Sequence, residues 1–113
     1  MMTPAAFRKY ALSLEGAHEA PHFARASFRI GKAIFATLAE RDGEAMVKVS
    51  SAARREELMR RHGETYFSYG GWTEKLGALG IRLANAEAAL VKELLSRAHA
   101  DVAAKAGKRR PKK

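Results

Sequence analysis

The chain has 113 residues, of which 47% are hydrophobic and 29% are charged, and it contains no cysteine. This length suits one domain with a single core, and the hydrophobic content excludes the class of chains that stay disordered. The lack of cysteine excludes disulfides and thiolate metal sites, and no stretch approaches the roughly 18 apolar residues of a membrane span. The sequence also lacks the unbroken apolar run of a signal peptide, so we expect a soluble, cytoplasmic protein.

The positive charge is concentrated at the C-terminal end. The net charge is +9, from 21 Lys and Arg against 12 Asp and Glu. Residues 105–113, KAGKRRPKK, hold six of the basic side chains and none of the acidic ones, which leaves 15 against 12 in residues 1–104. We therefore predict a single domain over residues 1–104 and a disordered basic tail over residues 105–113, in which Lys108, Arg109 and Arg110 are candidate phosphate contacts.

The N-terminal residues predict a helix. Thr3 followed by Pro4 is typical of a helix start, because the Thr hydroxyl accepts a backbone N–H that the helix leaves unpaired and proline suits the first turn. Phe7 and Leu14 then lie on one apolar face at helical spacing. Gly16 is the predicted end of this helix.

Residues 18–22 read HEAPH, which matches the HExxH zinc signature of metalloproteases. That site requires a helix, because the helix brings both histidines to one face and sets the Glu beside the metal-bound water. Gly16 lies just before the motif and Pro21 stands inside it, and both disfavour a helix. We therefore expect a turn here and no metal site.

No other catalytic motif is present in the sequence. It contains no GxSxG, no P-loop, no GxGxxG and no cysteine nucleophile. We therefore expect neither enzymatic activity nor a cofactor.

The middle of the chain predicts a three-stranded antiparallel meander. Residues 27–30 and 33–38 are strand-like runs separated by Gly31 and Lys32. Glycine at the first of these two positions suits a type II′ hairpin turn, because it supplies the required positive φ. A second glycine turn leads into the third strand, AMVKVS.

Two further helices and one more strand complete the prediction. Ser50 or Ser51 caps a helix that continues to about His62, and ALGIRL predicts a strand over residues 78–83. Asn85 is predicted to cap a long final helix. The expected fold is α+β, with an antiparallel sheet, helices packed on it and the order α-β-β-β-α-β-α.

Basic side chains recur on the predicted strands and turns. Arg29, Lys32, Lys48 and Arg82 alternate with apolar residues, which predicts that several share the solvent face of the sheet. With Arg54 and Arg55 on the second helix, they form a candidate contact surface for DNA phosphates. The alternative is a solvated sheet face whose charges keep the protein soluble and its edges unpaired.

An aromatic segment, GETYFSYGGW, follows the second helix. Tyr66, Tyr69 and Trp72 suit three alternatives, namely a ligand pocket, stacking on bases, and packing over the sheet or helices.

The order of elements and several segments resemble the MmcQ/YjbR family. These segments are TPAAFRKYALSLEGAHE, FRIGKAIFATL, AMVKVS, GGW and ADVAAK, and the resemblance spans roughly residues 3–105. It implies a fold similar to CyaY-like and secretion-chaperone-like α+β domains, and a DNA-binding role through a proposed double-wing arrangement. The matching positions are Phe28, Arg29, Gly31, Lys32, Phe35, Lys48 and Trp72.

Together, these features predict a non-enzymatic protein that binds the DNA backbone through the basic sheet face, the hairpin turn and the C-terminal tail. Two alternatives come from other classes of protein. One is a protein-interaction module, either a homodimer or a chaperone-like binder of another protein. The other is a small-ligand binder with a pocket near Trp72.

Overall fold

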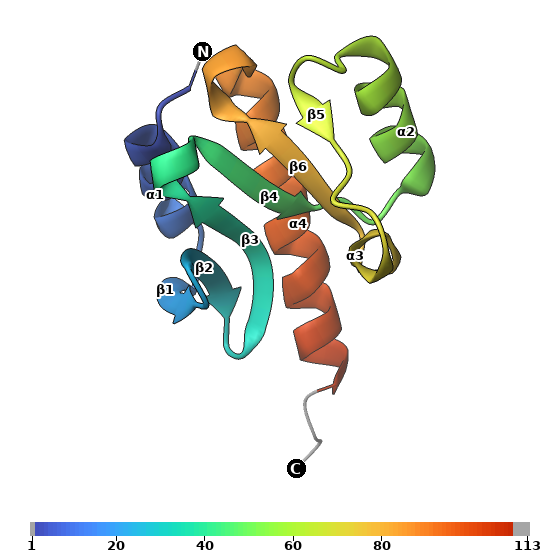
Figure 1. Ribbon diagram of the computed structural model, residues 1–113. Coiled ribbons are helices and arrows are strands. Elements are labelled where there is room, and N and C mark those ends of the chain that lie inside the picture. The colour runs from blue at the N-terminus through green and yellow to red at the C-terminus, as the bar shows by residue number, and fades with distance from the viewer. Residues whose placement is uncertain (1, 110–113) are drawn as a thin grey trace.

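The computed structural model describes residues 2–109, apart from the side chains of Trp72 and of residues 106–109. The chain forms two layers, a six-stranded antiparallel sheet with helices on one of its faces (Figure 1). The predicted α+β class, an antiparallel sheet with helices packed on it, is confirmed. None of the helices in this range is long and apolar enough to cross a membrane.

The sheet has the strand order β1-β2-β3-β4-β6-β5, and all neighbours are antiparallel. The elements in chain order are α1 (Pro4–Ser13), β1 (Ala17–His22), β2 (Arg25–Ile30), β3 (Ala33–Ala39), the 3₁₀ turn η1 (Glu40–Asp42), β4 (Glu44–Lys48), α2 (Ala52–Arg61), β5 (Tyr66–Phe67), α3 (Trp72–Lys75), β6 (Ala78–Arg82), the 3₁₀ turn η2 (Leu83–Asn85) and α4 (Ala88–Arg109).

The local start and turn signals are confirmed. The Thr3 hydroxyl accepts the Ala6 N–H at 3.1 Å at the start of α1, and the Ser51 hydroxyl accepts the Arg54 N–H at 3.1 Å at the start of α2. Gly31 has a φ of 61°, as a type II′ turn between β2 and β3 requires.

The HEAPH segment forms strand β1, so the expected turn is wrong. His18 pairs with Arg29 and Pro21 with Ala26, at the outer edge of the sheet, where the missing N–H of a proline is tolerated. Four strand residues span about 13 Å, so His18 and His22 do not have the spacing that a helix gives the two zinc ligands. The described part of the chain holds no group of three or more His, Cys, Asp or Glu suited to a metal ion.

The final helix also differs from the prediction. It begins at Ala88, and Asn85 belongs to η2 instead of capping α4. The Asn85 side-chain amide donates to the Glu64 carbonyl oxygen at 2.7 Å, so it ties the segment before β5 to the approach of α4. At its other end α4 passes the expected domain boundary at residue 104 and continues to Arg109.

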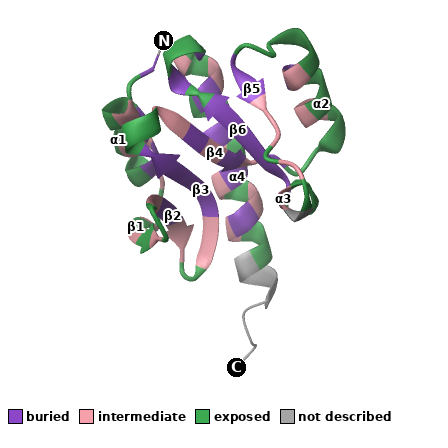
Figure 2. Cartoon of the chain, in the orientation of Figure 1, coloured by how far each residue is buried: buried purple, intermediate pink, exposed green. Residues whose placement is uncertain are grey.

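The core lies between one face of the sheet and the helices. Helices α1 and α4 pack on this face, and α2 packs beside β5 and contributes Leu58. Figure 2 shows the buried residues along the central strands and on the sheet side of α4. The largest fully buried side chains include Phe7, Phe28, Phe35, Leu79, Ile81 and Leu95.

Candidate functional site

The predicted basic residues lie in three separate places. Lys32 and Lys48 border a groove at one end of the sheet, beside the C-terminal part of α4. Arg29 and Arg82 lie on the open face of the sheet, outside the lining of this groove. Arg54 and Arg55 lie on α2 and are engaged by neighbouring groups.

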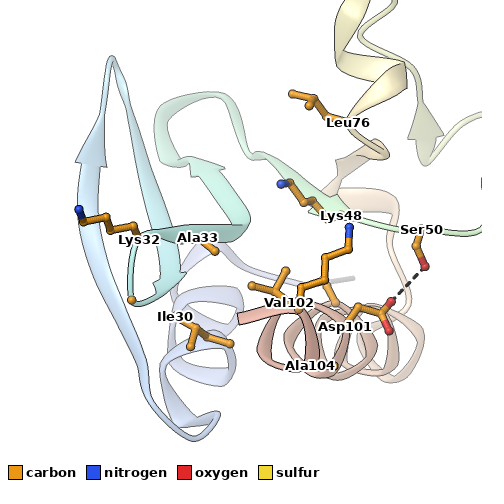
Figure 3. Close-up of a pocket in the computed structure, with 12 residues that line it drawn as sticks. Ile30, Lys32, Ala33, Lys48, Ser50, Leu76, Asp101, Val102 and Ala104 are labelled. Carbon is orange, nitrogen blue, oxygen red and sulfur yellow. Dashed lines mark hydrogen bonds between the residues drawn. The ribbon is translucent and has the colours of Figure 1, made fainter. Parts of the chain in front are cut away.

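The groove has a volume of about 670 Å³ (Figure 3). It opens between the β2–β3 turn, the end of β4, the residue after α3, and the C-terminal part of α4. Among the described side chains, three lysines border it: Lys32, Lys48 and Lys105. Its apolar lining consists of Ile30, Ala33, Leu76, Ala98, Val102 and Ala104.

Backbone geometry at the ends of strands positions the first two lysines. Lys32 is the second residue of the two-residue β2–β3 turn, and it is exposed. Lys48 is the last residue of β4, and the following Val49 donates its N–H to the Gly77 carbonyl oxygen at 2.8 Å. Arg55 donates to the Val49 carbonyl oxygen, so its guanidinium fixes this junction from α2.

Lys48 has an unusual electrostatic environment. Partial burial lowers the pKa of its ammonium, and the positive charge of Lys105 lowers this pKa further. Among the described side chains it forms no ion pair with an Asp or Glu. Asp101, the one carboxylate in the groove lining, accepts a hydrogen bond from the Ser50 hydroxyl at 3.1 Å.

The open face of the sheet carries three arginines that hydrogen-bond or stack on neighbouring groups. Arg29 donates to the Ser27 hydroxyl at 2.8 Å, and the Arg82 guanidinium lies 4.4 Å from the centre of the Phe67 ring. The third, Arg25, donates to the hydroxyls of Thr37 at 2.9 Å and Tyr69 at 3.0 Å.

Sequence reasoning missed Arg25. Its signal is the Arg25-Ser27-Arg29 alternation along β2, which places all three side chains on one face.

Two of the predicted pocket residues, Tyr66 and Tyr69, lie on opposite faces of the sheet. Tyr66 lies in the core, paired with Ile81 on the helix side of the sheet. Tyr69 lies on the open face, with its ring 5.0 Å from that of Phe67. The side chain of Trp72 is outside the described part of the chain.

The remaining candidates are on α2 and at the C-terminus. Arg54 pairs with Glu93 of α4 at 3.3 Å, so it links two helices. The backbone of Lys108 and Arg109 belongs to the last turn of α4, whereas their side chains, and all of Arg110, lie outside the described residues. Lys105 was missed as part of a site, although it lies one helical turn after Asp101 and so on the same side of α4.

Comparisons with known proteins agree with this fold. The family model described as YjbR matches residues 12–100. The crystal structure of Deinococcus radiodurans protein DR2400, described with a DUF419 domain, is similar with a TM-score of 0.73 and 21% identity. The match covers 88% of this chain and 77% of that chain, and at this identity it shows the fold alone. No curated protein matches the chain.

Proposed function

The chain belongs to the YjbR family, and from that premise we propose that it is a cytoplasmic, non-enzymatic protein that binds duplex DNA through the phosphate backbone. The observation that carries the proposal is the meeting of Lys32, Lys48 and Lys105 around one end of the molecule. Lysine ammonium groups on phosphates supply the sequence-independent part of DNA affinity. The lack of cysteine suits a reducing compartment.

The distribution of charge along the molecule supports this choice of surface. The β2–β3 turn and the C-terminal end of α4 lie at the same end of the molecule (Figure 1). Residues 105–113, which begin in the last turns of α4, carry six basic side chains and no acidic one. The acidic residues of the β3–β4 connection, Glu40 and Asp42, lie at the other end of β3. This asymmetry attracts a polyanion to one end of the molecule.

The contact surface differs from the one that the alternation of basic residues predicted. It keeps Lys32 and Lys48 and adds Lys105. It leaves out Arg29, which donates to the Ser27 hydroxyl, and Arg82, which stacks on the Phe67 ring. It also leaves out Arg54, which pairs with Glu93. Because lysines act as point charges and not as bidentate readers of base edges, the proposal implies little sequence preference.

The test is a fluorescence-anisotropy titration of a labelled duplex at several salt concentrations. We expect log K against log salt to become shallower by about 2 to 3 when Lys32, Lys48 and Lys105 are all replaced by Gln, since each lost phosphate contact removes about 0.9 from the slope.

The matched control replaces Lys9, Arg41 and Arg60 with Gln, which removes the same charge from exposed positions on α1, η1 and α2. Equal effects of the two triple variants would show that only net charge acts, and would refute this contact surface.

A protein-interaction module is the second candidate function, and a specific observation favours it. Phe23, at the turn between β1 and β2, is 95% exposed. It lies at the end of the edge strand β1, whose outer side is paired with no strand of residues 2–109. An exposed aromatic ring beside a free strand edge is typical of a contact with another chain. Light scattering after size exclusion distinguishes a dimer formed in this way from a monomer.

A further inference from the structure

We propose that the groove between the β2–β3 turn, the end of β4 and the C-terminal part of α4 binds a small organic anion that has an apolar body. Lys48 and Lys105 hold the anionic group, and the apolar lining covers the body. This inference goes beyond the proposed function, because a phosphate backbone has no apolar part to place against such a lining.

The size and the lining of the groove fit a ligand of this kind. A volume of about 670 Å³ lies within the range of roughly 300–1,000 Å³ in which proteins bind small molecules. Ile30 and Ala33 line it from the hairpin, and Ala98 and Val102 line it from α4. In Figure 3, Ile30 lies below Lys32 and Val102 lies below Lys48, and these four residues line the same groove.

The charges around the groove favour an anion. Lys48 and Lys105 are close enough for each to act on the other, and both are positive. Partial burial makes the ammonium of Lys48 costly, and the described side chains offer it no carboxylate partner. An anionic group between the two lysines removes their repulsion and pairs the partly buried charge. The lowered pKa of Lys48 is consistent with a partly buried ammonium that lies near a second cation and has no anionic partner.

The one acid in the lining does not satisfy these lysines. Asp101 accepts the hydrogen bond of Ser50, which holds its carboxylate toward the start of α2 (Figure 3). Arg55 donates to the carbonyl oxygens of Val49 and Glu74, which are close in sequence to the lining residues Lys48 and Leu76. The walls of the groove are thus held by hydrogen bonds that do not depend on a ligand.

Two fluorescent probes separate the two parts of the proposal. Anilinonaphthalene sulfonate has an apolar body with one anionic group, and N-phenylnaphthylamine has a similar body without charge. We expect the full chain to bind both, and Lys48→Gln and Lys105→Gln each to weaken the sulfonate by about tenfold, as for the loss of one charged hydrogen bond. The uncharged probe should change less than about twofold.

Lys105→Gln guards against misfolding as an explanation, because Lys105 is exposed on α4 and lines only the groove. The matched control is Lys92→Gln, an exposed lysine on the same helix that lies over the Tyr10 ring. Unchanged binding of the sulfonate by both groove variants would overturn the proposal. Equal losses of affinity for the two probes would also overturn it, because the lysines would then not distinguish the anionic probe from the uncharged one.

Displacement of the bound sulfonate probe identifies the chemistry of the ligand. We expect octanoate and octyl phosphate to displace it well below the concentration at which inorganic phosphate does. Displacement by inorganic phosphate at the same concentration would overturn the requirement for an apolar body. These measurements contain no DNA, so their failure leaves the duplex titration, and the proposed function, untouched.

Discussion

At the scale of single residues, Tyr66 carries a polar atom that the fold does not satisfy. Its side chain is 3% exposed, and its hydroxyl has no hydrogen-bond partner among the described residues. A buried hydroxyl without a partner costs about 1–3 kcal/mol. Tyr66→Phe keeps the ring and removes this cost, so we expect the free energy of unfolding to rise by about 1 kcal/mol in urea.

The same residue predicts a dependence of stability on pH. Burial, and then the negative charge of Glu87, raise the pKa of Tyr66 from 10 to about 12. Between these values the unfolded chain has lost the phenolic proton and the folded chain keeps it, so the free energy of unfolding falls as pH rises through this range. We expect urea unfolding at pH 9 and pH 11 to show a smaller fall for Tyr66→Phe than for the unchanged chain. An equal fall in both would mean that other groups cause it.

Phe23 is a second residue whose conformation is costly. Its φ is 58°, the only positive value outside glycine in the described chain, and its ring is 95% exposed. A residue with a Cβ is destabilised by about 1–2 kcal/mol in this region of φ. Glycine removes this strain, but its greater freedom in the unfolded chain offsets part of the gain. Phe23→Gly should therefore raise the free energy of unfolding by about 0.5–1 kcal/mol.

Gly31→Ala is the matched comparison. Gly31 has a φ of 61° and open space where a Cβ would stand, so the substitution should lower the free energy of unfolding by a similar amount. If Phe23 is an interface residue, Phe23→Gly also removes the dimer in light scattering while stabilising the monomer. A Phe23→Gly protein that unfolds more easily than the unchanged chain would contradict the assignment of strain.

At the scale of elements, local chemistry explains which parts were predictable. The Thr3 and Ser51 hydroxyls cap their helices, and Gly31 sets its turn, through interactions within a few residues of sequence. The HEAPH strand has no such local signal, because its residues become a strand by pairing with β2 along its whole length. The two-residue strand β5 likewise exists through its pairing with β6.

The pairing of β5 with β6 depends on Gly80. A Cβ at this position would lie 2.5 Å from the Phe67 ring, which covers the glycine on the open face. Gly80→Ala must displace this ring from its contacts with Tyr69 and Arg82, and we expect a loss of about 1–3 kcal/mol in the free energy of unfolding. Hydrogen exchange should accelerate at the β5–β6 pairs first.

A double-mutant cycle with Phe67→Ala checks the cause. Once the ring is absent, Gly80→Ala has no atom to displace and should cost little, which gives a coupling energy of about 1 kcal/mol or more. Equal costs of Gly80→Ala with and without the ring would assign the effect to the backbone of β6 instead.

At the scale of the whole molecule, alternation along strands predicted the fold class but only part of the site. The sequence identifies Arg29 and Lys32 as neighbours on one hairpin, whereas the fold directs Arg29 to the open face and Lys32 to the groove. Alternation does not say which face the helices cover. Nor does it say that Lys48 and Lys105, from a strand and from the last helix, meet across one groove. Those facts come from the packing of α4 on the sheet.

Truncation separates the charge of the groove lysines from the charge of the basic residues that follow Lys105, because the described buried residues of α4 all precede Lys105. The last buried residue of its described stripe is Val102. A chain that ends at Lys105 keeps this stripe and all three lysines of the groove, and it loses five of the basic side chains that follow. We expect its thermal unfolding to match that of the full chain.

The duplex titration of this truncated chain then divides the affinity between the folded surface and the C-terminal residues. If all five lost side chains contact phosphates, log K against log salt becomes shallower by up to about 4 to 5. The binding that remains should be lost when Lys32, Lys48 and Lys105 are replaced by Gln. A truncated chain with no measurable affinity at low salt would assign DNA binding to the C-terminal residues alone, and the lysines around the groove would then serve its small-molecule site.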